Sequence, residues 1–342
     1  MLCPGDSPHT RPWVDELCAR GHEVLVYAYP PVAADFAGAH VDVVGGGGPL
    51  GRARWIARRV KDDKPDVVTQ HYVATDAFAL SHLGKPLVLS VWGSDVLCDL
   101  VRRPKRLMVA HALRSAALVV SPAQHATEVI IELGVDPLRV LTRQYGVDTT
   151  VYTSCRDGTA REAPVRVICT RGMRSVYGNE DIIDAVARTS VDHIRDVIFT
   201  GRGALLVELQ ALAAQLGLDA RACFLGGVDD MHEALCSADI YCSMSRSDGA
   251  SLSLLEAMSC GLPVVVSDIA ANREWVVDGH NGFLVPCRDV GTLAERLETL
   301  AADPDLRSRV GRAGRETILE RGNKNVNVPA IIDAVEKAVG SA

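Results

Sequence analysis

Short apolar segments alternate with amphipathic segments along the whole chain, and this alternation restricts the possible folds more than any other feature. Candidate strands lie at residues 23–29, 67–71, 87–91, 118–121 and 140–141, and then at 166–170, 197–200, 222–225, 240–244 and 263–267. Helical patterns, such as those at residues 12–20, 182–189 and 205–216, lie between them. This alternation predicts parallel sheets with helices on both faces, and therefore an α/β protein.

The candidate strands fall into two sets, with a polar, loop-like stretch at residues 148–164 between them. The chain of 342 residues is long enough for two domains of ordinary size. We expect two Rossmann-like domains, residues 1–150 and 151–320, followed by a C-terminal helix at 321–342 that returns toward the first domain. Parallel sheets bind ligands at the carboxyl ends of their strands, so the site is expected in a cleft between the domains.

The first domain is expected to lack its first strand. Residues 4–8 (PGDSP) resemble the loop that follows such a strand, and only Met1, Leu2 and Cys3 precede them. A strand of the usual length, about five or six residues, does not fit there. We expect the true start of the protein to lie upstream of Met1; the alternative is a sheet whose first strand is genuinely short.

The composition is that of a soluble globular protein, with 48% hydrophobic and 23% charged residues. The absence of an apolar run of about 18 residues and of a signal-peptide pattern favours a cytoplasmic protein, with peripheral attachment to the inner face of the membrane as an alternative. Ten cysteines without a Cys-x-x-Cys pair are expected to be reduced thiols rather than disulfides or zinc ligands. The net charge of −7 argues against a nucleic-acid partner.

Residues 243–268 (SMSRSDGASLSLLEAMSCGLPVVVSD) carry the clearest functional signal. They predict a strand, a polar loop with Asp248, a helix that begins near Leu252 and contains Glu256, and a second strand after Gly261 and Pro263. The amino end of a helix presents free N–H groups and suits a phosphate. Carboxylates accept hydrogen bonds from sugar hydroxyls. Together these features predict a site for a nucleotide sugar.

This segment resembles the signature of the retaining glycosyltransferases of the GT-B fold, family 4 (glycosyltransferase group 1), E-G-F-G-x-x-x-x-E-A-M-A-C-G-x-P-V-V. Here it reads D-G-A-S-L-S-L-L-E-A-M-S-C-G-L-P-V-V. The departures are Asp248 for the first Glu, and Ala250 and Ser251 for Phe-Gly. Further resemblances lie in order along nearly the whole chain: RGHEV at 20–24, PDVV at 65–68, WGSD at 92–95, GVD at 146–148 and LG at 225–226.

The resemblance implies roles for residues of the second domain. Arg171 is expected on the donor diphosphate, Glu256 on the ribose, and Asp248 on a sugar hydroxyl or near the positive charge that develops at the anomeric carbon. The lysine that relatives carry about five residues after this arginine is absent, with Tyr177 and Gly178 near its place, so Arg174 could supply the second charge. The remaining expected donor contacts are Gly201, Gly226, Val228, Gly249, Ala250, Ser251 and Leu252.

In the first domain, His71 and Asp95 are expected to face the site if their strands end there, although His71 could equally be a buried core histidine. Trp92 stands where relatives often have a sugar-binding histidine. The sequence contains no Asp-x-Asp motif and no evident His/Cys/carboxylate cluster, so neither a metal ion nor another cofactor is expected. The donor substrate is expected to be a nucleoside diphosphate sugar.

A basic helix is expected at residues 51–61, with Trp55 on its flank and Arg54, Arg58 and Lys61 facing outward. A second basic cluster comprises Arg102, Arg103, Lys105 and Arg106. Basic helices with Trp can bind anionic lipid, although a solvated arginine face is the simpler interpretation.

The expected activity is metal-independent transfer of a hexose from a nucleoside diphosphate sugar to a hydroxyl of a glycan, a lipid-linked or a small-molecule acceptor, with retention of anomeric configuration, in polysaccharide or glycoconjugate biosynthesis. The alternatives are a catalytically impaired nucleotide-sugar-binding subunit and a GT-B sugar-phosphate synthase.

Overall fold

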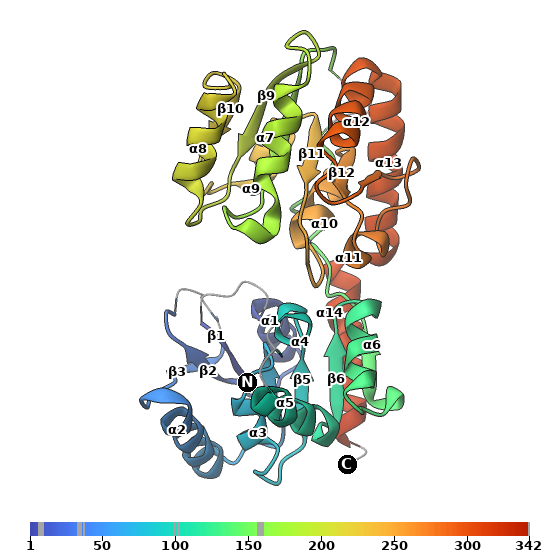
Figure 1. Cartoon of the computed structure of the whole chain (residues 1–342). Helices are drawn as coiled ribbons and strands as arrows, with labels where there is room; N and C mark the ends of the chain where they lie inside the picture. The colour runs from blue at the N-terminus through green and yellow to red at the C-terminus, as the bar shows by residue number, and fades with distance from the viewer. Residues whose placement is uncertain are drawn as a thin grey trace. The chain divides into compact units, whose positions relative to one another are not determined.

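The computed structural model describes residues 1–5, 10–32, 36, 38–98, 100, 103–155 and 161–340. Part of the loop expected at 4–8, Arg102 of the second basic cluster and part of the linker expected at 148–164 lie outside these residues. The chain forms two compact units, residues 1–145 with 325–342, and residues 146–324. In each unit the described strands form one parallel sheet that helices enclose (Figure 1). The α/β class and the two Rossmann-like halves are confirmed.

In unit 1 the sheet has the order β3-β2-β1-β4-β5-β6-β7. Its strands are β1 (Leu2–Pro4), β2 (Leu25–Tyr29), β3 (His40–Val43), β4 (Val68–His71), β5 (Leu87–Ser90), β6 (Leu118–Ser121) and β7 (Val140–Thr142). Its helices are α1 (Arg11–Ala19), α2 (Gly48–Asp63), α3 (Asp76–Leu80), α4 (Ser94–Leu97), α5 (Arg103–Ser115), α6 (Gln124–Glu132) and all but the first residue of α14 (Lys324–Gly340).

The expectation that the first strand is missing is wrong. Leu2–Pro4 form strand β1, which pairs with β2 on one side and with β4 on the other. The strand is three residues long, and Leu2 and Cys3 are buried within the core. Three residues are enough because the flanking strands are also short and helices cover both faces of the sheet. The sheet is therefore continuous through its centre.

Unit 2 has a sheet of order β10-β9-β8-β11-β12-β13. Its strands are β8 (Val165–Cys169), β9 (Ile194–Phe199), β10 (Ala222–Phe224), β11 (Ile240–Ser243), β12 (Val264–Ser267) and β13 (Phe283–Val285). Its helices are α7 (Asn179–Ala187), α8 (Leu206–Gln215), α9 (Met231–Cys236), α10 (Leu252–Ser259), α11 (Ala270–Arg273), α12 (Val290–Ala302) and α13 (Pro304–Arg321).

Alternate strand residues pack on opposite faces of each sheet. In β8, Val167 belongs to one hydrophobic cluster and Ile168 to another, and both are fully buried. In β5, Leu87 and Leu89 share one cluster, whereas Val88 packs with helix α14 on the other face. A sheet that is apolar on both faces is typical of doubly covered parallel sheets. Helix α14 thus completes the core of unit 1.

Two of the cysteines depart from the expectation that all are reduced thiols. Cys155 and Cys236 form a disulfide, so the expectation of reduced thiols is wrong for this pair. The folded chain brings together two cysteines that are far apart in sequence, a proximity that spacing alone does not reveal.

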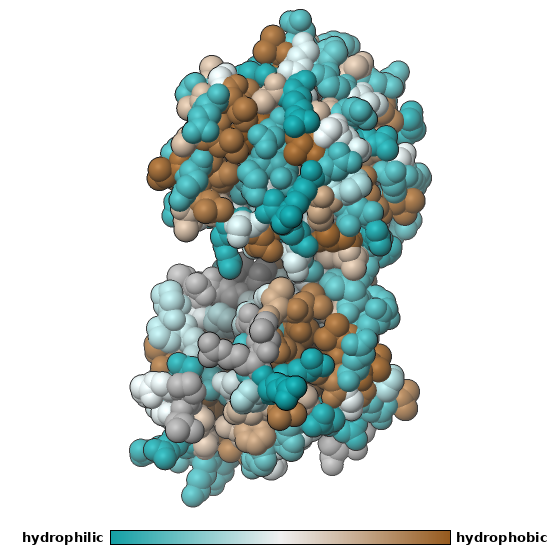
Figure 2. Space-filling view, viewed as in Figure 1, coloured by the Kyte–Doolittle hydropathy of each residue, from teal (hydrophilic) through white to brown (hydrophobic). Residues whose placement is uncertain are grey.

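Hydrophilic and hydrophobic residues are interspersed over the face shown in Figure 2. Among the described residues, no helix has the length and apolar character needed to cross a bilayer.

The basic helix expected at 51–61 lies within α2. Ile56 and Val60 are buried, and Arg54, Arg58 and Lys61 are exposed, as expected. The ring of Trp55 packs against the core edge-on to Tyr27, with the ring centroids 5.6 Å apart. Its indole is therefore engaged within unit 1.

Candidate active site

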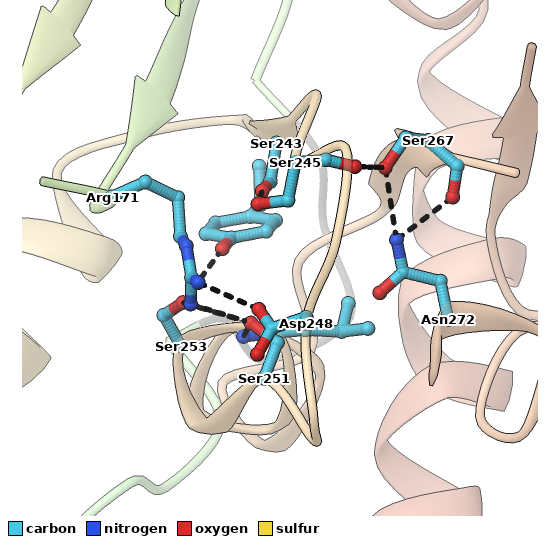
Figure 3. A network of polar contacts seen from close by, with 10 residues as sticks. Arg171, Ser243, Ser245, Asp248, Ser251, Ser253, Ser267 and Asn272 are labelled. Carbon is cyan, nitrogen blue, oxygen red and sulfur yellow. Dashed lines mark hydrogen bonds and ion pairs between the residues drawn. The ribbon is translucent and has the colours of Figure 1, made fainter. Parts of the chain in front are cut away.

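The candidate site of unit 2 lies at the carboxyl end of its sheet, where strands β8 and β11 run side by side. Arg171 follows β8, and Asp248 lies in the loop that joins β11 to α10. Their side chains form an ion pair, with 2.6 Å between Nη2 of Arg171 and Oδ2 of Asp248 (Figure 3). Adjacent parallel strands deliver their following loops to the same edge, which explains why residues 77 positions apart meet.

The amino end of helix α10 completes this arrangement. Ser251 is the N-cap residue, and its hydroxyl accepts a hydrogen bond from the N–H of Leu254. The other terminal guanidinium nitrogen of Arg171 donates to the hydroxyls of Ser251 and Ser253, each at 3.0 Å (Figure 3). The pair is well shielded, with side-chain exposures of 13% for Arg171 and 14% for Asp248. A guanidinium and a helix amino end therefore meet at one point, as a phosphate site requires.

Tyr177 holds the guanidinium from a second direction. The Arg171 guanidinium carbon lies 4.2 Å from the centroid of the Tyr177 ring, a cation–π contact. Burial lowers the pKa of Arg171, but the charge of Asp248 together with Tyr241, Tyr177 and Cys169 raises it above its ordinary value, so the group stays a cation. The Nε of Arg171 is buried and has no hydrogen-bond partner among the described residues. A buried donor without a partner suits an anionic ligand oxygen.

The loop near the expected place of the family lysine packs closely against the β11 loop. Gly178 has a φ of +60°, and a Cβ at this position would collide with the carbonyl of Met244. The loop around Gly178 is also tied to the β11 loop by the N–H of Arg246, which donates to the carbonyl of Val176 at 2.8 Å. Arg174, the expected second cation, is exposed on this loop.

The β11 loop is braced from behind by buried polar groups. The hydroxyl of Ser267 donates to the carbonyl of Ser245, and the amide of Asn272 donates to the carbonyl of Ser267 at 2.8 Å (Figure 3). Ser243 and Ser245 hydroxyls are 3.2 Å apart. These contacts fix the backbone from which Asp248 projects.

Glu256 lies in the second turn of α10 and is half-buried. Burial raises the pKa of its carboxyl group to about 7, although the hydrogen bond from Tyr152 and the charge of Arg171 lower it. Burial raises the pKa of Tyr152, and its contact with Glu256 raises that pKa further. Tyr152 was not expected, because it precedes β8 by more than ten residues and no spacing rule connects it to Glu256.

The remaining expected contacts lie on neighbouring loops. A Cβ at Gly201 would collide with the backbone of Arg171, so glycine allows the β8 and β9 loops to touch. Gly226 has a φ of +72°, and the loop that follows it places Gly227 against the Arg202 guanidinium. Arg202 is a further cation at this edge that sequence reasoning missed. Of the other expected contacts, Val228 lies on the loop after β10, Gly249, Ala250 and Ser251 lie on the loop after β11, and Leu252 begins α10.

His71 and Asp95 belong to unit 1 and are both buried. Asp95 accepts hydrogen bonds from the N–H groups of Val73, Trp92 and Gly93 at 2.8 to 3.1 Å. Burial raises its pKa to about 6, against the lowering effect of these hydrogen bonds. This geometry lets Asp95 organise the loop between β5 and α4; a catalytic role stays a prediction.

The ring of His71 packs edge-on to two tryptophans. Its centroid lies 4.6 Å from that of Trp13 and 6.2 Å from that of Trp92. This packing is what a buried core histidine would show, and the catalytic role stays a prediction.

The structure contains a cluster of cysteine and histidine side chains that was not expected from the sequence. Ligand atoms of Cys155, His232 and Cys236 lie within 4.8 Å of one another. The spacing of four between His232 and Cys236 on a helix was the available signal. Cys155 comes from a distant segment, so only the fold completes the cluster.

Comparison with known proteins gives consistent matches over both units. Residues 156–317 match the family model described as glycosyl transferases group 1, and residues 7–151 match that described as glycosyltransferase family 4. The lipopolysaccharide core biosynthesis glycosyltransferase LpsE of Rhizobium meliloti is 26% identical over 292 residues, which cover 85% of this chain and 79% of LpsE.

Two further similarities differ in extent. The chain is 34% identical to the Bacillus subtilis protein named "Putative glycosyltransferase EpsD". The alignment covers 41% of this chain and 37% of EpsD. The aligned region thus spans well under half of that relative. The structure of HepE from Anabaena in complex with UDP-glucose superposes with a TM-score of 0.81 at 18% identity, over 98% of this chain and 99% of HepE. This likeness shows that the fold is GT-B.

Proposed function

The chain belongs to the glycosyltransferase group 1 family, and from this premise we propose that it transfers a hexose from a nucleoside diphosphate sugar to an acceptor hydroxyl with retention of configuration. The observation that carries the proposal is the meeting of Arg171, Asp248 and the capped amino end of α10 at one sheet edge. UDP-glucose in the complex of HepE, which has the same fold, supports a donor of this class.

Each group has a defined task in this proposal. Arg171 and the N–H groups that begin α10 stabilise the negative charge that grows on the leaving diphosphate. Glu256 accepts hydrogen bonds from the ribose, and Asp248 binds the hexose or stabilises the cationic anomeric carbon. The acceptor attacks from the face that the diphosphate leaves, and a diphosphate oxygen takes the proton of its hydroxyl. The anomeric configuration is then kept.

Donor binding tests the assignment of Arg171 and Glu256. Each residue would make a charge-assisted contact, so Arg171→Ala and Glu256→Gln should each weaken donor binding by about 1.5–3 kcal/mol. Calorimetry with UDP-, GDP- and dTDP-sugars identifies the donor and measures the loss. The matched controls are Arg188→Ala and Glu295→Gln, which alter an exposed residue at the carboxyl end of α7 and an exposed residue of α12. Equal affinity in wild type and both site variants would refute the assignment.

We propose that turnover needs no divalent metal, because Arg171 and α10 supply positive charge at the diphosphate. Turnover should be unchanged in EDTA. Loss of activity in EDTA with recovery on adding Mg²⁺ or Mn²⁺ would contradict this. The anomeric coupling constant of the product, measured by NMR, tests retention separately.

A catalytically impaired binding subunit and a sugar-phosphate synthase remain the competing functions. Asp248 in place of glutamate and the missing lysine favour the first. A protein that binds the donor but releases no nucleotide diphosphate when acceptors are added would be a binding subunit. A phosphorylated product would identify a synthase.

We propose a lipid-linked acceptor, which the name of LpsE and the exposed cations Arg54, Arg58 and Lys61 support. Because Trp55 is packed inward, attraction to a membrane would be mainly electrostatic, at about 1 kcal/mol per cation. Liposome flotation should recover more protein with anionic than with neutral vesicles, and the excess should vanish when the three cations are changed to serine. Equal recovery with both vesicles would count against the docking surface.

A further inference from the structure

The cysteine and histidine cluster of unit 2 joins three separate segments of the chain. His232 and Cys236 lie one turn apart on α9, Cys155 lies on the segment before β8, and Cys260 caps the end of α10. The Nδ1 of His232 is 3.5 Å from the Sγ of Cys260 and 3.7 Å from the Sγ of Cys236. The Nδ1 of His232 therefore faces the sulfurs of Cys236 and Cys260, and the Sγ of Cys236 also lies 3.6 Å from Nε2. The ligand atoms of Cys155, His232 and Cys236 lie within 4.8 Å of one another.

The two separations from Nδ1 match sulfur–nitrogen edges of a tetrahedral zinc site, whereas the sulfurs of Cys155 and Cys236, which are joined in a disulfide, must part before both can bind a metal. Zinc binds thiolate sulfur at about 2.3 Å and imidazole nitrogen at about 2.0–2.1 Å, which places sulfur and nitrogen ligands about 3.6 Å apart in a tetrahedron. The two distances to Nδ1 lie within 0.1 Å of this value. Three thiolates and one imidazole form a common donor set for structural zinc.

Groups outside the four ligands hold the arrangement in place. The Nε2 of His232 is 3.4 Å from the hydroxyl of Thr153, which can accept the remaining ring proton and leave Nδ1 for a metal. The N–H of Cys155 donates to the carbonyl of Cys260 at 3.0 Å, which fixes two ligand-bearing segments relative to each other. All these residues belong to unit 2.

We propose that, with the Cys155–Cys236 disulfide reduced, Cys155, His232, Cys236 and Cys260 bind one structural Zn²⁺ ion. Two molecules of a small thiol reduce the disulfide: its S–S bond breaks, each cysteine sulfur gains a proton, and the reductant is released as its own disulfide. Zinc then displaces the three thiol protons. The metal state and the disulfide state exclude each other. This site is independent of sugar transfer, and its metal takes no part in the chemistry proposed above.

Cobalt titration of the full-length protein tests the site. After anaerobic reduction with dithiothreitol and removal of the reductant, one Co²⁺ per chain should bind with thiolate-to-cobalt charge-transfer absorption and the visible bands of tetrahedral cobalt. Zn²⁺ should abolish both signals. The oxidised protein, with its disulfide intact, should show neither until it is reduced.

Variants assign the ligands. Cys155→Ser, Cys260→Ser and His232→Ala should each alter the cobalt spectrum and lower affinity for Co²⁺ at least 10-fold, and Thr153→Val should lower it about 10–100-fold. Cys287→Ser, which removes an exposed thiol elsewhere in the unit, should match wild type. His232 is only partly buried, so His232→Ala keeps the test decisive if a cysteine variant fails to fold. Absence of the absorption in reduced wild type, or its persistence unchanged in His232→Ala, would overturn the proposal.

Discussion

At the scale of single residues, the pair formed by Arg171 and Asp248 orders the candidate site before any substrate is present. Each charge has the other as its partner, and Tyr177 and two serine hydroxyls fix the guanidinium further. A preorganised cation spends little free energy on reorientation when the diphosphate arrives. Asp248 is shorter than the family's glutamate, and in this structure its reach suffices for Arg171.

Glu256 should make donor binding depend on pH. Burial raises its pKa to about 7, so the carboxyl group changes charge near neutrality. Ribose hydroxyls donate to the ionised form, and donor affinity should therefore rise from pH 6 to pH 8 and then level off. Calorimetry in buffers of different ionisation enthalpy should also detect proton release on binding, which Glu256→Gln should lack.

The carboxyl group of Glu256 should give folding stability a pH dependence opposite to that of donor affinity. Its pKa in the folded state lies above the ordinary value of 4.5, so between pH 4.5 and 7 the folded state holds a proton that the unfolded state has lost. Its contribution to the free energy of unfolding should fall as pH rises through this range. Denaturant unfolding of wild type and Glu256→Gln compares the two slopes; identical slopes would contradict the assigned pKa.

At the scale of elements, sequence periodicity predicted ten of the strands and missed β1, β3 and β13. The ten candidate strands correspond to β2 and to β4–β12. Strand β3 was missed because it is an edge strand of HVDV with exposed ends, and β1 because its three residues are fewer than the usual strand length. The β13 segment FLV is equally short. A sheet supplies these strands with partners that a local pattern cannot show.

Some residues of the candidate site could be predicted from the sequence, and others could not. Arg171, Asp248 and Ser251 were predictable because a motif and a strand end mark them, and the structure brings them together. Arg202 and Tyr152 were not, since they reach the site from loops without a marked spacing. The cysteine cluster was overlooked for the same reason: two of its sulfurs lie 81 residues apart in the chain.

At the scale of the whole molecule, unit 1 consists of two separate parts of the chain. Helix α14 buries Val328, Ile331, Ile332 and Val335 against Trp13 and against Val88, Leu118 and Val120 of the sheet. Arg20 adds ion pairs to Asp333 and Glu336 at 2.7 and 3.0 Å. Four buried aliphatic side chains at about 1.5–3 kcal/mol each amount to a large part of a domain's stability, which is about 5–15 kcal/mol.

Removal of one of these side chains should destabilise unit 1 selectively. Ile332→Ala should lower its free energy of unfolding by about 2–5 kcal/mol, because it leaves a cavity between α14 and the sheet. Val326→Ala, at an exposed position of the same helix, should change it by less than about 0.5 kcal/mol. Hydrogen exchange locates the effect: protection should fall in β5 and β6 and stay unchanged in β8 and β11. A uniform loss over both units would show that they unfold together.

The return of α14 to unit 1 has a consequence for biosynthesis. A ribosome makes residues 1–145 first, but the sheet face that carries Val88, Leu118 and Val120 lacks its contacts with α14 until that helix emerges. Unit 2, which lies between the two parts, has its complete sequence earlier. The first unit to be translated is therefore the last to be finished, and during this interval Val88, Leu118 and Val120 are available to a chaperone.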